Sequence, residues 1–84
     1  MGLRVLPGGG VEQSPVEWWR ATAAACRRLA ARADGDTPAA VAVTAQWAGT
    51  VPVGADGEAL SDALIWMDAR GAPFVRRAAC VHPD

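Results

Sequence analysis

The segment after Ser14 repeats apolar and small residues at three- and four-residue spacing, and arginines fall mostly between them. The repeating positions are Trp18, Thr22, Cys26, Leu29 and Ala33. This spacing predicts a helix with one face that is buried in the folded protein. The adjacent Trp18 and Trp19 cannot both lie on that face, so at least one is expected at its edge. Packing is favoured for this pair, and ligand contact is the alternative.

The ends of this helix carry recognisable signals. Ser14 can accept hydrogen bonds from free backbone amides, Pro15 suits the first helical position, and Glu17 is placed to reach back to the cap. At the other end, Asp34-Gly35-Asp36 followed by proline predicts a stop near Ala33.

The second half of the chain changes to short apolar runs. Ala40–Ala45 is continuous and rich in valine, which predicts a strand covered on both faces. Thr50–Val53 and Ala63–Met67 are predicted to pair as a hairpin around a glycine turn, with Pro52 at an edge. Pro73–Cys80 predicts the start of a second helix.

The first ten residues predict little regular structure. Leu3–Leu6 is a short apolar run, and the following Pro7–Gly10 is expected to be a loop because it cannot continue a helix or a central strand. The three glycines lack the lysine of a phosphate loop and the spacing of a dinucleotide-binding motif, so phosphate binding is not predicted for them.

The composition predicts one small domain with a core, because 51% of the 84 residues are hydrophobic and 20% are charged. Eight arginines are balanced by nine acids, so neither nucleic acid nor an anionic membrane is a predicted partner. No apolar run approaches the roughly 20 residues that cross a bilayer. Cys26 and Cys80 form no metal or disulfide pattern, which favours reduced thiols in the cytoplasm. The one histidine, His82, is interpreted as incidental.

Polar and aromatic residues follow the predicted strands. Gln46 and Trp47 follow the first one, and Trp66, Asp68 and Arg70 follow the last. Ligands of open α/β sheets bind at the carboxyl ends of strands, and an indole with amide, carboxylate and guanidinium groups suits a sugar. Strand-end packing with a surface ion pair between Asp68 and Arg70 remains the alternative interpretation.

Three motifs in order, VEQSPVEWW, VAVTAQWAGTVPVGADGEAL and ALIWMDARGA, resemble the amino-terminal part of an FGGY carbohydrate kinase of the xylulokinase-like, pentulose-phosphorylating branch. The resemblance runs from about Pro7 to about Arg77. It implies an α/β, ribonuclease H-like domain of the actin and hexokinase superfamily. It also implies transfer of the γ-phosphoryl group of magnesium ATP to a sugar hydroxyl, with the sugar held by the amino-terminal domain.

The resemblance also implies which residues meet the sugar. In the family, the two positions after the motif glutamine contact the sugar, the tryptophan of the "WxD" motif lies beside it, and the following aspartate and arginine shape the pocket. The implied substrate-binding residues are Gln46, Trp47, Ala48, Trp66, Asp68 and Arg70. Many pentulose kinases have methionine and histidine where this chain has Trp47-Ala48, which puts the identity of the sugar in doubt.

The family's first ATP-binding hairpin and its catalytic aspartate have no counterpart in these 84 residues. We therefore expect a fragment of the sugar-binding domain, residues 1–84, built as helix, strand, hairpin and helix start, without a second domain. ATP and Mg²⁺ would belong to the complete enzyme, and the chain alone would be inactive and marginally stable. Its partner would be the rest of the kinase or a second copy. The alternative is a non-catalytic, stand-alone binding or dimerisation module.

Overall fold

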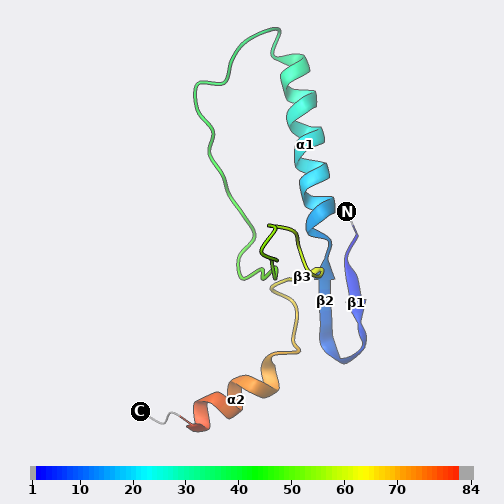
Figure 1. Ribbon diagram of the computed structural model, residues 1–84, viewed down its shortest axis with the longest axis vertical. Helices are drawn as coiled ribbons and strands as arrows, with labels where there is room; N and C mark the ends of the chain where they lie inside the picture. The colour runs from blue at the N-terminus through cyan, green and yellow to red at the C-terminus, as the bar shows by residue number, and fades with distance from the viewer. Residues whose placement is uncertain (1, 82–84) are drawn as a thin grey trace.

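The computed structural model describes residues 2–81 and combines two helices with a small antiparallel sheet (Figure 1). The sheet has the strand order β1-β2-β3. Its elements, in chain order, are β1 (Arg4–Leu6), the 3₁₀ turn η1 (Pro7–Gly9), β2 (Gly10–Gln13), α1 (Pro15–Arg32), β3 (Ala63–Leu64) and α2 (Ala72–Val81). Helices with a small sheet agree with the predicted α/β class at this coarse level.

The amino-terminal residues form a hairpin that the sequence analysis did not predict. β1 pairs with β2 in the register Arg4 with Glu12, Val5 with Val11 and Leu6 with Gly10. Gly8 and Gly9 have φ angles of 79° and 84°, which glycine adopts without steric cost. The expected loop at Pro7–Gly10 is therefore the turn of this hairpin, and its last glycine already belongs to β2.

The first helix begins and ends close to the predicted positions. Ser14 is the N-cap, its Oγ accepts a hydrogen bond from the backbone N–H of Glu17 at 3.3 Å, and Pro15 follows as the first helical residue. The helix ends at Arg32, and Asp34 and Gly35 continue with positive φ angles. The Glu17 carboxylate accepts a hydrogen bond from the N–H of Gly2 instead of reaching back to the cap.

The prediction of a buried face on α1 is wrong. No residue of this helix is buried, and Leu29, in the middle of the predicted face, is 70% exposed. Figure 1 shows the helix extending away from the sheet, with only its first turns near other elements. An amphipathic pattern buries its apolar face only when a neighbouring layer lies against it, and residues 2–81 place none there.

The predicted strand at Ala40–Ala45 is also wrong. These residues have no regular structure, and Val41 and Val43 are 85% and 89% exposed. A strand is stabilised by hydrogen bonds to a neighbouring strand, and no described segment pairs with this one. The apolar sequence alone was insufficient to form the strand.

The predicted hairpin of Thr50–Val53 with Ala63–Met67 is present only as isolated contacts. Thr50 and Leu64 exchange two backbone hydrogen bonds of 2.8 and 2.9 Å, and Val53 forms a single bridge with Ala59. Gly57 has a φ angle of 84° in the intervening turn, as the sequence predicts. The predicted strand Ala63–Met67 shortens to β3, whose partner in the sheet is β2.

The core is small and lies where the start and end of the chain meet. Val11, Ala63 and Ile65 are the buried hydrophobic residues among those described. The radius of gyration is 18.1 Å, against about 12 Å for a compact domain of this length. The described residues therefore form a small anchored sheet from which α1 and the following loop extend. The helix predicted from Pro73 is confirmed as α2.

We expect Ser14→Ala to reduce the stability of α1 by about 1 kcal/mol, because it removes the cap oxygen. Far-UV circular dichroism of the 84-residue chain would show lower helix content. Ser61→Ala is the matched control, since Ser61 is exposed and its hydroxyl donates only to the neighbouring Asp62 carbonyl. Equal helix content in wild type and Ser14→Ala would contradict the capping role.

We also expect the isolated chain to unfold gradually, since few of the described side chains are buried and neither described helix packs extensively on the sheet. Thermal circular dichroism combined with light scattering measures this. A monomer with a sharp cooperative transition above about 60 °C would contradict the expectation, because that is typical of a complete small domain.

Candidate functional site

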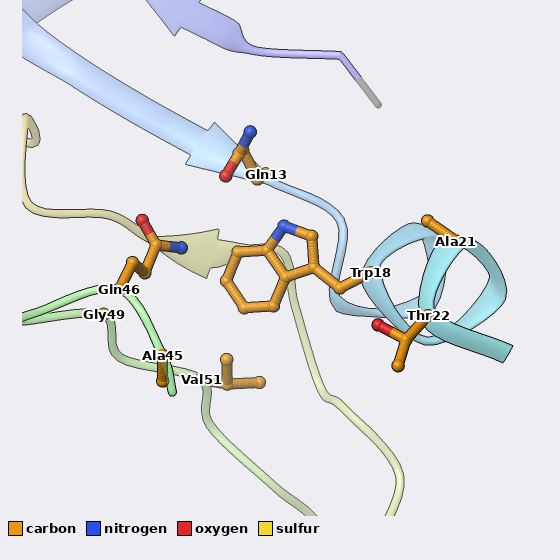
Figure 2. Close-up of a pocket in the computed structure, with 8 residues that line it drawn as sticks. All are labelled: Gln13, Trp18, Ala21, Thr22, Ala45, Gln46, Gly49 and Val51. Atoms are coloured by element: carbon orange, nitrogen blue, oxygen red, sulfur yellow. The ribbon is translucent and has the colours of Figure 1, made fainter. Parts of the chain in front are cut away.

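A pocket of about 480 Å³ opens between the start of α1, the end of β2 and the loop before β3 (Figure 2). Eight residues line it: Gln13, Trp18, Ala21, Thr22, Ala45, Gln46, Gly49 and Val51. Figure 2 shows the Trp18 ring reaching from α1 between the amides of Gln13 and Gln46. The lining thus combines an indole, two amides, a hydroxyl and small apolar groups.

The N-terminal cap of α1 sets the position of the pocket tryptophan. Gln13 ends β2, Ser14 caps the helix, and the N–H of Trp18 donates to the Ser14 carbonyl at 3.2 Å. Trp18 is therefore one helical turn after the cap, where it can reach across the pocket. Trp19 is 72% exposed and does not line the pocket. The two tryptophans have different environments, as their adjacent positions on a helix require.

The opposite side of the pocket is lined by residues just before and just after a turn at Trp47 and Ala48. Ala48 has a φ angle of 55°, which is uncommon for a residue with a side chain. The turn leads into Thr50, whose backbone is hydrogen-bonded to that of Leu64 in β3. Gln46 lines the pocket before the turn, whereas Trp47 is 89% exposed and lies outside the lining.

A second polar cluster joins β2 to the segment that follows β3. The Arg70 guanidinium donates from Nε to both Asp68 oxygens at 3.2 and 3.0 Å, and from Nη2 to Asp68 Oδ2 and Glu12 Oε1 at 2.7 Å each. Asp68 Oδ2 also accepts the N–H of Val11 at 2.8 Å. Arg4 extends the cluster by an ion pair with Asp62.

These contacts fix the charge state of the pair. The Arg70 guanidinium and the Val11 N–H hold the pKa of the Asp68 carboxyl well below its usual range. In return, the Asp68 and Glu12 carboxylates raise the pKa of Arg70 further. Asp68 is thus ionised at neutral pH and already bound by hydrogen-bond donors, which makes it a poor general base.

The structure separates the predicted site residues into two groups. Gln46 lines the pocket, while the other five do not: Trp47, Ala48, Trp66, Asp68 and Arg70. The predicted ion pair between Asp68 and Arg70 is present, with Glu12 as a third member. Trp66 is 64% exposed in a turn before this pair.

Sequence reasoning did not assign Gln13 or Glu12 to a site, and it favoured packing over ligand contact for Trp18. Gln13 immediately precedes a strong helix cap, and side chains at such strand-to-helix junctions border ligand sites in α/β proteins. That signal was available for Gln13. Glu12 offered no comparable signal, because its partner Arg70 is 58 positions away in the sequence. His82 lies outside the described residues.

Comparison with protein families gives a match over residues 6–79 to the FGGY family of carbohydrate kinases, N-terminal domain. The chain belongs to this family. The matched range contains the pocket and the Arg70 cluster, so both are parts of an FGGY amino-terminal domain. The resemblance inferred from the three motifs is confirmed.

Curated relatives of this FGGY chain include an erythritol kinase and two xylulose kinases. The erythritol kinase of Brucella abortus (strain 2308) is 45% identical over 73 residues, which are 84% of this chain and 14% of that protein. The xylulose kinase of Streptomyces coelicolor is 41% identical over 76 residues, 87% of this chain and 15% of the relative. The xylulose kinase of Streptomyces rubiginosus is 38% identical over 69 residues, which are 82% of this chain and 14% of the relative.

The FGGY chain therefore spans only 14% to 15% of the length of these relatives. No solved structure gives a significant match. Within residues 2–81, neither helix is long and apolar enough to cross a membrane.

ATP with Mg²⁺, which the family implies, does not fit the residues that the structure describes. A side chain at Gly9 would meet Ala69 at 3.2 Å, and one at Gly10 would meet Arg70 at 3.0 Å, so these glycines face protein and form no open phosphate cradle. The Asp68 and Glu12 carboxylates are occupied by Arg70. Between residues 2 and 81, no group of three acidic, histidine or cysteine side chains is placed to hold a metal.

We expect Asp68→Asn to remove an acid-sensitive contact. The folded pKa is lowered, so the stabilisation by Asp68 is complete above the unfolded carboxyl pKa of about 3.9 and is lost as the pH falls toward the folded pKa. In the NMR spectrum of the wild type, the Val11 amide signal should therefore stay constant near neutral pH and move only in acid. In Asp68→Asn, it should be shifted at neutral pH and lose this acid response.

Asp56→Asn is the control for this titration, because the Asp56 carboxylate accepts only the Glu58 N–H in an exposed turn. It should leave the Val11 amide signal unchanged. An identical acid response of Val11 in wild type and Asp68→Asn would show that the carboxylate does not bind this amide.

Proposed function

We propose that this chain forms part of the sugar-binding side of an ATP-dependent carbohydrate kinase that phosphorylates a pentulose or a related small polyol. The observation that carries the proposal is the position of Gln46. The family resemblance includes this glutamine in the implied substrate-binding set, directly before the two positions that contact the sugar, and it lines a pocket together with Gln13 and Trp18. The relatives support a polyhydroxylated substrate, since they are named for erythritol and xylulose.

The pocket chemistry suits such a substrate. Each glutamine amide offers two N–H donors and a carbonyl acceptor, so Gln13 and Gln46 can bond several hydroxyls at once. The indole face of Trp18 can pack against the C–H groups of a sugar, and its N–H adds one donor. Neutral groups at these positions favour a neutral sugar over a phosphorylated one. This selectivity suits an enzyme that adds the phosphate.

The remaining residues of the implied substrate-binding set would contribute to the same sugar site. Trp47 and Trp66 are exposed indoles, at 89% and 64%, and each is available to stack on a sugar. Ala48 follows Trp47 in the turn beside the pocket and would leave room where a larger side chain would not. Asp68 and Arg70 would shape the site from beside Trp66.

Phosphoryl transfer needs a metal, phosphate clamps and a base held together, and the described residues do not fit ATP with Mg²⁺. We propose that the remainder of a longer kinase supplies these groups. It would also complete a ribonuclease H-like sheet around Ala40–Ala45. The 84-residue chain alone would then be inactive, and the complete enzyme would work in the cytoplasm, where ATP is available.

The exposed apolar residues favour a second candidate, a stand-alone module that uses them to dimerise or bind another protein. Leu29, Val41 and Val43 are all at least 70% exposed. Light scattering distinguishes the two candidates. A module would form one discrete oligomer in solution, whereas a kinase segment would be heterogeneous until joined to the remaining chain.

We expect Gln46→Ala and Trp47→Ala, made in the complete kinase, to raise the sugar KM about tenfold with little change in the ATP KM. Each removes a contact to the sugar and none to the nucleotide, and tenfold corresponds to about 1.4 kcal/mol. Initial rates with xylulose, erythritol and related polyols would identify the substrate and give both constants.

Trp19→Ala is the matched control for Trp47→Ala, because Trp19 is likewise exposed and lies outside the pocket. It should leave both KM values unchanged. If Gln46→Ala and Trp47→Ala also leave the sugar KM unchanged, or if the complete kinase phosphorylates none of the polyols, the proposed function is wrong.

A further inference from the structure

A tight turn presents Trp66 directly after β3. The Ile65 carbonyl accepts a hydrogen bond from the Asp68 N–H at 2.8 Å, which places Trp66 and Met67 at the two central positions of the turn. Ile65 is 3% exposed, whereas Trp66 is 64% exposed. The turn therefore has a buried start and an exposed indole at its tip.

Both ends of this turn are bound to one residue of β2. The N–H of Ile65 donates to the Val11 carbonyl at 3.2 Å, and the N–H of Val11 donates to the Asp68 carboxylate at 2.8 Å. The N–H of Ala69 then donates to the Gly9 carbonyl at 2.9 Å. The orientation of Trp66 thus depends on how the Asp68 carboxylate is held.

Arg70 holds that carboxylate and connects it to β2. Its Nε and Nη2 donate to Asp68, and Nη2 also donates to Glu12. Glu12 lies next to Val11 in β2 and faces Leu64 of β3 in the sheet register. The side chains of Asp68, Glu12 and Arg70 are 6%, 17% and 37% exposed, so water competes only partly for these hydrogen bonds.

Gly10 allows the arginine to occupy this position. A Cβ atom on Gly10 would lie 3.0 Å from both Cζ and Nε of Arg70. The Gly10 backbone has φ −71° and ψ 135°, which any residue can adopt. The same Cβ would lie 3.1 Å from Leu6 Cβ, so the glycine allows the close approach of both the guanidinium and Leu6, and it is not needed for its backbone conformation.

We propose that Arg70 is a positioning residue: by bridging Asp68 to Glu12 across Gly10, it fixes the turn that presents Trp66 to the sugar. The inference rests on the proposed sugar-binding function and assigns Arg70 a role within it. Nε and Nη2 are already used by Asp68 and Glu12, so these donors act on the sugar only through the turn that carries Trp66. A lysine cannot replace it, because one ammonium group does not reproduce the planar, forked set of donors.

The test compares three variants of the complete kinase that disturb the bridge in different ways. Gly10→Ala displaces the guanidinium without removing a charge. Arg70→Lys keeps the positive charge and removes the planar set of N–H donors. Glu12→Gln weakens the hydrogen bond between Arg70 and residue 12. We expect each to raise the sugar KM about three- to tenfold while the ATP KM stays within about twofold. Gly71→Ala is the matched control, since a Cβ there meets nothing within 4 Å.

A second measurement reads the turn without using activity. In the 84-residue chain with Trp18→Phe, Trp19→Phe and Trp47→Phe, Trp66 is the tryptophan that remains of the four. Adding Gly10→Ala or Arg70→Lys should increase quenching of its fluorescence by acrylamide, because the indole becomes more mobile. Gly71→Ala should leave the quenching unchanged.

The outcomes separate this inference from the proposed function. If Trp66→Ala raises the sugar KM and the three bridge variants do not, the positioning role is wrong and the sugar site stands. Unchanged Trp66 quenching in both Gly10→Ala and Arg70→Lys also overturns it. Equal rises in sugar and ATP KM would indicate a general structural role and overturn it as well. Should Arg70→Lys not fold, Gly10→Ala and Glu12→Gln decide the question.

Discussion

The described structure depends on the contact between β2 and the segment that follows β3. Val11 provides both of its backbone groups to residues more than 50 positions later, with its carbonyl accepting from Ile65 and its N–H donating to Asp68. Val11 and Ile65 are also two of the buried hydrophobic residues. Without this contact the amino-terminal hairpin would have no partner, since a two-stranded hairpin is only marginally stable in water.

The pocket and the charged cluster follow from this anchored sheet. β2 continues into the Ser14 cap, which sets the start of α1 and therefore the position of Trp18. The neighbouring bond between Thr50 and Leu64 brings the loop that carries Gln46 to the same place. The charged cluster also uses β2, through the Glu12 carboxylate and the Val11 N–H. One short strand thus serves both the proposed pocket and the turn that carries Trp66.

The accuracy of prediction from sequence varied with how local the signals were. The start of α1 was predictable because Ser14 and Pro15 act within one helical turn. The Ala40–Ala45 strand and the buried face of α1 were not, because each requires a neighbouring element that the described residues do not supply. For the site, the motif indicated Gln46, which lines a pocket, and its role at a sugar stays a proposal. The bridge from Arg70 to Glu12 was not, because the two residues meet only when β3 pairs with β2.

The sequence by itself determined the family, the helix boundaries and the turn at Gly57. The helix boundaries and the turn rest on residue identity over a few positions. The family rests on three motifs in order, and the match over residues 6–79 agrees with it. Tertiary structure alone decided that Trp18 lines the pocket while Trp19 faces solvent, and that Asp68 is held by Arg70 and Val11. These outcomes depend on strand pairing across more than 50 residues, where the same side chains can face a neighbour or water with no change in sequence.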